Sequence, residues 1–64
     1  MFDEYDFVRL VADLKSKGLK AGTQGTIVMV YPSNPPEYEV EFVDEEGDTL
    51  ALETLKEDQI ELVL

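Results

Sequence analysis

Residues 37–43 alternate strictly between acidic and apolar side chains, in the order Glu37-Tyr38-Glu39-Val40-Glu41-Phe42-Val43. Successive side chains of a β-strand point to opposite faces of a sheet, so this pattern predicts a strand that buries Tyr38, Val40 and Phe42. The glutamates then share the opposite, solvated face. Because one strand cannot bury its own apolar face, the rest of the chain has to supply the other strands.

Four further segments have strand-like patterns. Residues 5–11 and 26–31 are rich in aromatic and β-branched side chains, which favour strands. Residues 49–53 alternate again, and a short apolar run lies at 60–63. The sequence therefore predicts an all-β fold with five strands, over residues 5–11, 26–31, 37–43, 49–53 and 60–63.

The connections between these strands have recognisable turn residues. The proline-rich run 32–36 stops the second strand, and Gly47 can take the left-handed backbone of a tight hairpin. Residues 12–22 lack alternation and are expected to form a long loop. Residues 55–59 fit one helical or 3-10 turn ahead of the last strand, capped by Thr54.

A chain of 64 residues can build one core, so we expect a single domain over residues 1–64. The inward positions of the five strands define that core. It is predicted to contain Val8, Leu10, Val28, Val30, Val40, Phe42, Leu50, Leu52 and Ile60.

The order of these motifs resembles the small bacterial family named domain of unknown function 4926. The resemblance depends on Asp6-x-Val8-x-Leu10, Gly22-x-x-Gly25-Thr26-Ile27-Val28, Tyr38-x-Val40-Glu41-Phe42, Asp44, Gly47, Thr49 and the segment from Leu55 to Ile60. It implies a five-stranded SH3-like barrel and assigns no activity. The glycine-then-strand element is also similar to the start of a KOW motif, a wider group whose members bind nucleic acid or ribosomal and polymerase proteins.

The residue types needed for common catalytic and metal sites are missing. The chain has no histidine and no cysteine, which excludes disulfides, the usual zinc sites and the common nucleophile–base pairs. The acidic segment 44–48 does not match a calcium loop, because its glycine is the fourth residue and an EF-hand needs it sixth. We therefore predict a protein that is not an enzyme and has no catalytic, cofactor or metal site.

Negative charge is concentrated in the second half of the sequence. Residues 1–36 contain equal numbers of acids and bases, so the net charge of −10 arises entirely from residues 37–64. Such a field repels nucleic acids and anionic membranes and attracts basic surfaces. No apolar stretch approaches the roughly 20 residues that a membrane helix needs, and we expect a cytoplasmic protein. The sequence leaves the oligomeric state open.

Two functional hypotheses follow, beside the simpler one that the acids only maintain solubility. The first is a protein-interaction module, for example an immunity or antitoxin protein, that binds a basic protein partner through an acidic hairpin. The second is an accessory or structural subunit that docks into a larger enzyme complex through apolar barrel surface. The predicted partner-binding residues of the first hypothesis are Glu37, Glu39, Glu41, Glu45, Glu46, Asp48 and Glu53.

Overall fold

Five antiparallel strands form one sheet in the order β4-β3-β2-β1-β5. The structure is a computed structural model that describes residues 1–64. The strands are β1 (Phe7–Leu10), β2 (Gln24–Tyr31), β3 (Glu37–Val43), β4 (Thr49–Lys56) and β5 (Ile60–Leu62). Two short 3-10 turns, η1 (Lys15–Lys17) and η2 (Glu57–Gln59), complete the regular structure.

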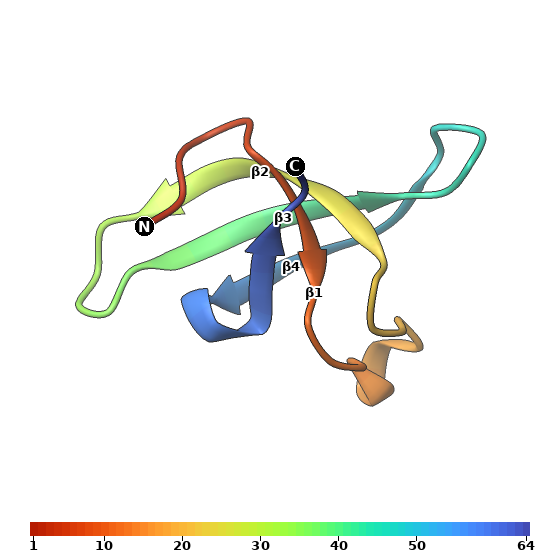
Figure 1. The fold of residues 1–64 in the computed structure, drawn as a ribbon, viewed down its shortest axis with the longest axis horizontal. Coiled ribbons are helices and arrows are strands. Elements are labelled where there is room, and N and C mark those ends of the chain that lie inside the picture. Colours follow the sequence, from red (N-terminus) through yellow and green to blue (C-terminus); the bar gives the residue numbers. More distant parts are fainter.

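The sheet curls so that its short strands lie over its long ones. The strands β1 and β5 run side by side and cross over β2, β3 and β4, and the β3–β4 hairpin projects at one end (Figure 1). The all-β class, the five strands and the 3-10 turn before the last strand are confirmed.

The core lies inside this curl and draws residues from every strand and from the long loop. Tyr38, Val40 and Phe42 are completely buried, which confirms the predicted orientation of β3. The full set of buried apolar residues is Val8, Leu10, Leu19, Ile27, Tyr38, Val40, Phe42, Leu55 and Ile60.

The predicted orientation of β4 is wrong. Leu50 and Leu52, expected in the core, keep 53% and 54% of their surface exposed. The reason is the register: Phe42 pairs with Ala51, and Val40 pairs with Glu53. Directly paired residues point to the same face of a sheet, so Ala51, Glu53 and Leu55 turn inward and Leu52 turns outward, while Leu50 is the extra residue of a bulge.

The orientation of β2 changes at a bulge. Its pairing with β3 shifts between Ile27 and Met29, which leaves Val28 as the extra residue. Ile27 is fully buried in place of the predicted Val28, which is half-buried. Beyond the bulge the predicted orientation holds, since Val30 packs against the core and Met29 is exposed.

The turn η2 is not capped as predicted. The backbone N–H of Lys56 donates to Oε1 of Gln59 at 2.8 Å, so this turn is closed by its own last residue. The Thr54 hydroxyl donates to Glu39 on the neighbouring strand instead. None of the helical segments is long and apolar enough to span a membrane.

Candidate interaction surface

Three predicted partner-binding residues form a row on the outer face of β3. Glu37, Glu39 and Glu41 occupy alternate positions, opposite in orientation to the buried residues of the same strand. The Thr54 hydroxyl donates to Oε1 of Glu39 at 2.5 Å, and the Thr49 hydroxyl donates to Oε2 of Glu41 at 2.9 Å. Both threonines belong to β4, so their hydroxyls hold the two carboxylates over the β3–β4 pair.

Exposed apolar side chains lie on both sides of this row. Met29 pairs with Glu39 from β2, and Leu52 pairs with Glu41 from β4. Tyr31 pairs with Glu37 on the β2 side. We call this surface the outer face; it consists of Met29, Tyr31, Glu37, Glu39, Glu41, Leu50 and Leu52, and its apolar members are 37% to 54% exposed.

No basic side chain forms an ion pair with the row of glutamates. The ion pairs of the structure join the Met1 ammonium to Glu57, Arg9 to Glu61 and Lys17 to Glu53. Glu37 lies opposite Lys56 in the register, yet the two form no ion pair. The row is therefore three adjacent carboxylates whose only close partners are two hydroxyl groups.

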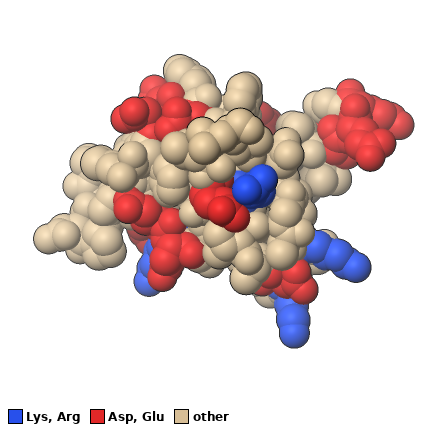
Figure 2. Space-filling view, viewed as in Figure 1, with Lys and Arg blue, Asp and Glu red and all other residues tan.

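Glu45, Glu46 and Asp48 lie at the tip of the β3–β4 hairpin, away from the row. The turn is built around Asp44, whose Oδ1 accepts from the backbone N–H groups of Glu46 and Asp48, each at 2.9 Å. Gly47 has a φ of 86°, the left-handed backbone predicted for it. Figure 2 shows these acids as a cluster on the projecting hairpin.

Glu53 does not belong to the outer face. It was expected to join the same acidic flank as Glu39 and Glu41, but its pairing with Val40 turns it inward. Its side chain is 18% exposed, and its carboxylate lies 3.9 Å from Nζ of Lys17 in the long loop. The predicted partner-binding residues therefore fall into three separate groups: the row on β3, the acids at the tip of the hairpin, and Glu53, which points inward from β4.

A cleft of about 700 Å³ lies between the base of the hairpin and the start of β2. Phe7 and Val43 supply its apolar wall, and Asp44 and Glu45 supply acid at its rim. Phe7 is 65% exposed. The cleft adjoins the outer face, because Phe7 pairs with Thr26, which pairs in turn with Glu41.

The sequence missed the apolar half of this surface. Leu50 and Leu52 were predicted in the core, and Met29 and Tyr31 were not assigned to either face of the sheet. One available signal was Leu55, which fits the core only if odd-numbered residues of β4 turn inward.

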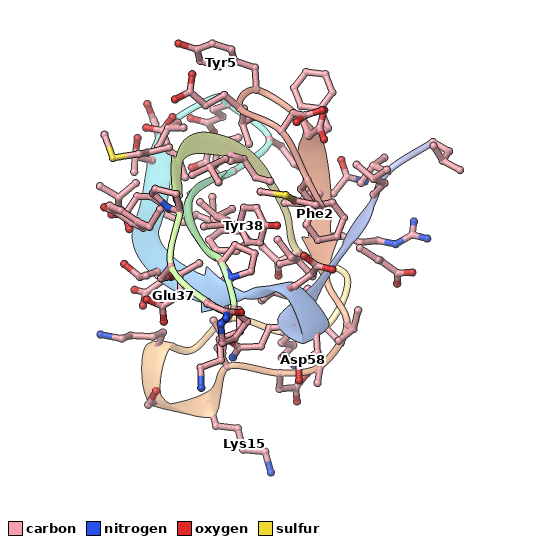
Figure 3. All side chains as sticks on the ribbon, turned by 90° about the vertical axis from the view of Figure 1, so that its left-hand side faces the viewer. Phe2, Tyr5, Lys15, Glu37, Tyr38 and Asp58 are labelled. Atoms are coloured by element: carbon pink, nitrogen blue, oxygen red, sulfur yellow. The ribbon has the colours of Figure 1, made fainter.

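Behind the acidic row, Tyr38 closes one end of the core. Its ring packs edge-on against Phe2, with centroids 5.3 Å apart, and Figure 3 shows the two side by side. The Tyr38 hydroxyl accepts from the backbone N–H of Phe2 at 3.1 Å and donates to Oε1 of Glu57 at 2.9 Å. Burial, together with Glu57, raises the pKa of Tyr38 above its ordinary value.

The outer face combines exposed carboxylates with exposed apolar side chains. No group of three or more acidic side chains is arranged to hold a metal ion. The carboxylates of the row lie on an open face, where no apolar pocket encloses them. Such a surface can attract cations and cover an apolar patch at the same time.

Comparison with known proteins identifies the chain at the level of its family. No curated protein and no solved structure matches it. Residues 4–62 match the family described as domain of unknown function 4926, which covers nearly the whole chain of 64 residues. The resemblance of the strand and glycine motifs is thereby confirmed, and the chain belongs to the family of domain of unknown function 4926.

Proposed function

We propose that this protein is a non-catalytic interaction module whose outer face binds a basic protein partner. The observation that supports this most is the row of Glu37, Glu39 and Glu41, which forms no ion pair within the protein. Like charges held on adjacent positions cost folding stability, and a cationic partner relieves that cost. The row therefore makes better sense as half of an interface than as a free surface.

The apolar residues beside the row indicate that the partner surface also contains apolar side chains. Met29, Leu50 and Leu52 expose apolar surface next to the carboxylates. Interfaces gain affinity by burying such side chains, while charges steer the encounter and fix the orientation. The expected partner surface is thus basic with apolar side chains between its charges. An immunity or antitoxin protein that covers a basic, nucleic-acid-binding toxin is one biological form of this function.

The exposed leucines also favour a second candidate function. An accessory subunit of a larger enzyme complex would dock through Leu50, Leu52 and Met29, and the acids around them would only remain solvated. Both functions use the same face of the molecule. They differ in whether charge or apolar contact provides the affinity.

Charge reversal separates these two functions. The protein is immobilised, partners are captured from cells that express it, and the dissociation constant is measured for each purified partner. We expect a basic partner whose affinity for the Glu39→Lys, Glu41→Lys variant falls by more than tenfold. Leu50→Ser, Leu52→Ser should weaken it less.

The matched control reverses two acids elsewhere. Glu4→Lys, Asp58→Lys changes the net charge by the same amount, and both residues are exposed and lie outside the outer face. This control should retain affinity within about threefold, because it leaves the local charge of the row unchanged. A partner that binds the Glu39→Lys, Glu41→Lys variant undiminished, but loses the leucine variant, would establish the accessory-subunit function instead.

A further inference from the structure

The strand β4 leaves one edge of the sheet open. It is the terminal strand in the order β4-β3-β2-β1-β5 and is eight residues long. Its ladder to β3 satisfies the backbone groups on one side. The backbone hydrogen bonds outside the ladders involve no residue from 49 to 55, so the other side of β4 has no partner within the protein.

Open edges of this length are usually blocked, because they pair with other chains. The two ends of β4 have such features: a bulge near Leu50 and Lys56 at the last position. The middle, from Ala51 to Leu55, has neither proline nor lysine. Glu53 is its one charged residue.

The negative charge of Glu53 determines which side chains an added strand can place beside the middle of β4. Its carboxylate is mostly buried, and its close charged neighbour is Lys17 Nζ at 3.9 Å, beyond hydrogen-bond distance. A strand that adds beside β4 places one side chain directly opposite Glu53. An acidic or apolar residue there is penalised, and a lysine or arginine is favoured.

The outer face selects apolar side chains on the other face of the added strand. Its outward side chains lie beside Leu52 and Thr54, two strand spacings from the row that contains Glu39 and Glu41. Two spacings are about 9.6 Å, so the row acts on the added strand through its negative field, which favours a segment of net positive charge. Apolar residues of the added strand cover Leu52.

We propose that the basic partner binds by strand addition: it presents an extended segment with alternating basic and apolar residues, which pairs with the free edge of β4. This inference rests on the proposed function and names its geometry. Main-chain hydrogen bonds supply affinity in this mode, and alternate side chains supply specificity.

A second copy of this chain does not fit the edge. Two molecules with a net charge of −10 each repel one another. Pairing of two β4 strands would also bring two Glu53 side chains close to the new interface, with no added base to compensate either. The occupant is therefore a basic segment of another protein.

The probe is a seven-residue peptide, Lys-Val-Lys-Val-Lys-Val-Lys, acetylated and amidated at its ends. Two isomers carry three N-methyl groups each, either on the last three lysines or on the three valines, which blocks hydrogen bonding along one edge or the other. Both isomers keep the same charge and side chains, so they are matched controls for each other. Affinities are measured by titration at low salt, together with hydrogen exchange of the amides in residues 49–55.

We expect one isomer to bind at least tenfold more weakly than the unmodified peptide and the other to bind within about threefold of it. Amides on the free side of β4 should exchange more slowly when the peptide is present. Glu53→Gln should weaken the peptide by about threefold or more, since it removes the inward charge. Equal affinity for both isomers, unchanged exchange, or no binding of the parent peptide would overturn strand addition.

The same titration distinguishes this inference from the proposed function. If Glu39→Lys, Glu41→Lys abolishes binding while both methylated isomers bind like the parent, the acidic face stands and strand addition fails. If methylation on one edge abolishes binding while the charge reversal has no effect, strand addition stands and the charged row is not the determinant. A faster-sedimenting species of the protein alone at high concentration would point to a second copy on the edge and would also overturn the proposal.

Discussion

Single residues show that an apolar side chain in this chain is not always a buried one. Phe42 is completely buried, whereas Leu52, from the neighbouring strand, keeps more than half of its surface in water. Both are apolar and both occur in alternating segments. The free energy that each contributes to folding depends on its surroundings in the sheet, so the two should respond differently to the same truncation.

Phe42→Ala should lower the free energy of unfolding by about 3–5 kcal/mol, because it removes a buried ring and leaves a cavity. Leu52→Ala should change it by no more than about 0.5 kcal/mol, since its side chain is already solvated. Chemical denaturation of both variants measures the difference. Comparable losses from the two substitutions would mean that Leu52 is a core residue and that the register of β4 is wrong.

Tyr38 links its buried ring to the stability of the protein at high pH. Its folded-state pKa is raised by burial, so the stabilisation from the neutral hydroxyl is complete below about pH 10, the ordinary tyrosine pKa. That stabilisation is lost as the pH rises through the folded-state pKa. The melting temperature should therefore fall above about pH 10 more steeply in the wild type than in Tyr38→Phe.

Tyr5→Phe is the control for this alkaline transition, because Tyr5 is 72% exposed. It should follow the wild-type curve. At neutral pH, Tyr38→Phe should cost about 1–2 kcal/mol, since it removes the hydroxyl that bonds Phe2 and Glu57. Identical alkaline curves for the wild type and Tyr38→Phe would exclude the buried hydroxyl as the cause.

At the scale of elements, sequence predicts a strand well where one of its faces is purely polar. The strand β3 has acids on one face and apolar residues on the other, and both its bounds and its orientation were predicted. In β2 both faces are apolar, so the pattern could not reveal the bulge at Val28. The all-β class and all five strands were nevertheless recognised.

The strand β4 shows why alternation alone can mislead. Leu50 and Leu52 are more apolar than Ala51 and Glu53, so the pattern favours the wrong face. The register with β3 decides the orientation, and that register depends on the hairpin and the bulge beside it. The acidic row was therefore predictable from β3, whereas the apolar residues beside it and the inward position of Glu53 were not.

Contact between β2 and β3 depends on a glycine. A Cβ atom at Gly25 would lie 2.7 Å from the Glu41 carbonyl oxygen and 2.8 Å from Cγ1 of Val40. Gly25→Ala should therefore lower the free energy of unfolding by about 1–3 kcal/mol, because the two strands have to move apart. Thermal and denaturant melts provide the measurement.

Gly47→Ala is the comparison for Gly25→Ala, because it introduces backbone strain without a steric clash. Gly47 has a positive φ and open space around its Cα, so its substitution should cost about 1–2 kcal/mol through strain alone. Gly47→Asn should recover part of that loss, since asparagine tolerates the left-handed backbone. Gly25→Asn should recover nothing. A Gly25→Ala variant as stable as the wild type would show that β2 and β3 are not in close contact at this point.

For the whole molecule, repulsion between acids is the dominant electrostatic effect. The chain has 15 acidic and 5 basic residues, and its ion pairs are 3.4 to 3.9 Å long. Two of the three pairs are largely exposed to solvent and contribute little. Salt should screen the repulsion more than it weakens these few attractions.

The melting temperature should accordingly rise when sodium chloride is added at neutral pH, and it should rise again on mild acidification toward the pI of about 4.1. The Glu39→Lys, Glu41→Lys variant should start from an equal or higher melting temperature and respond less to salt. A melting temperature that falls steadily with added salt would show that attractive pairs outweigh the repulsion.

The central claim is that the outer face of β3 and β4 engages a basic partner. Its most direct test is a map of the backbone amides whose NMR resonances shift when the captured partner is added. The account predicts that the largest shifts fall within residues 37–43 and 49–55, and that the loop at 12–22 changes little. Shifts confined to that loop, or an outer face that remains unperturbed at saturating partner, would contradict it.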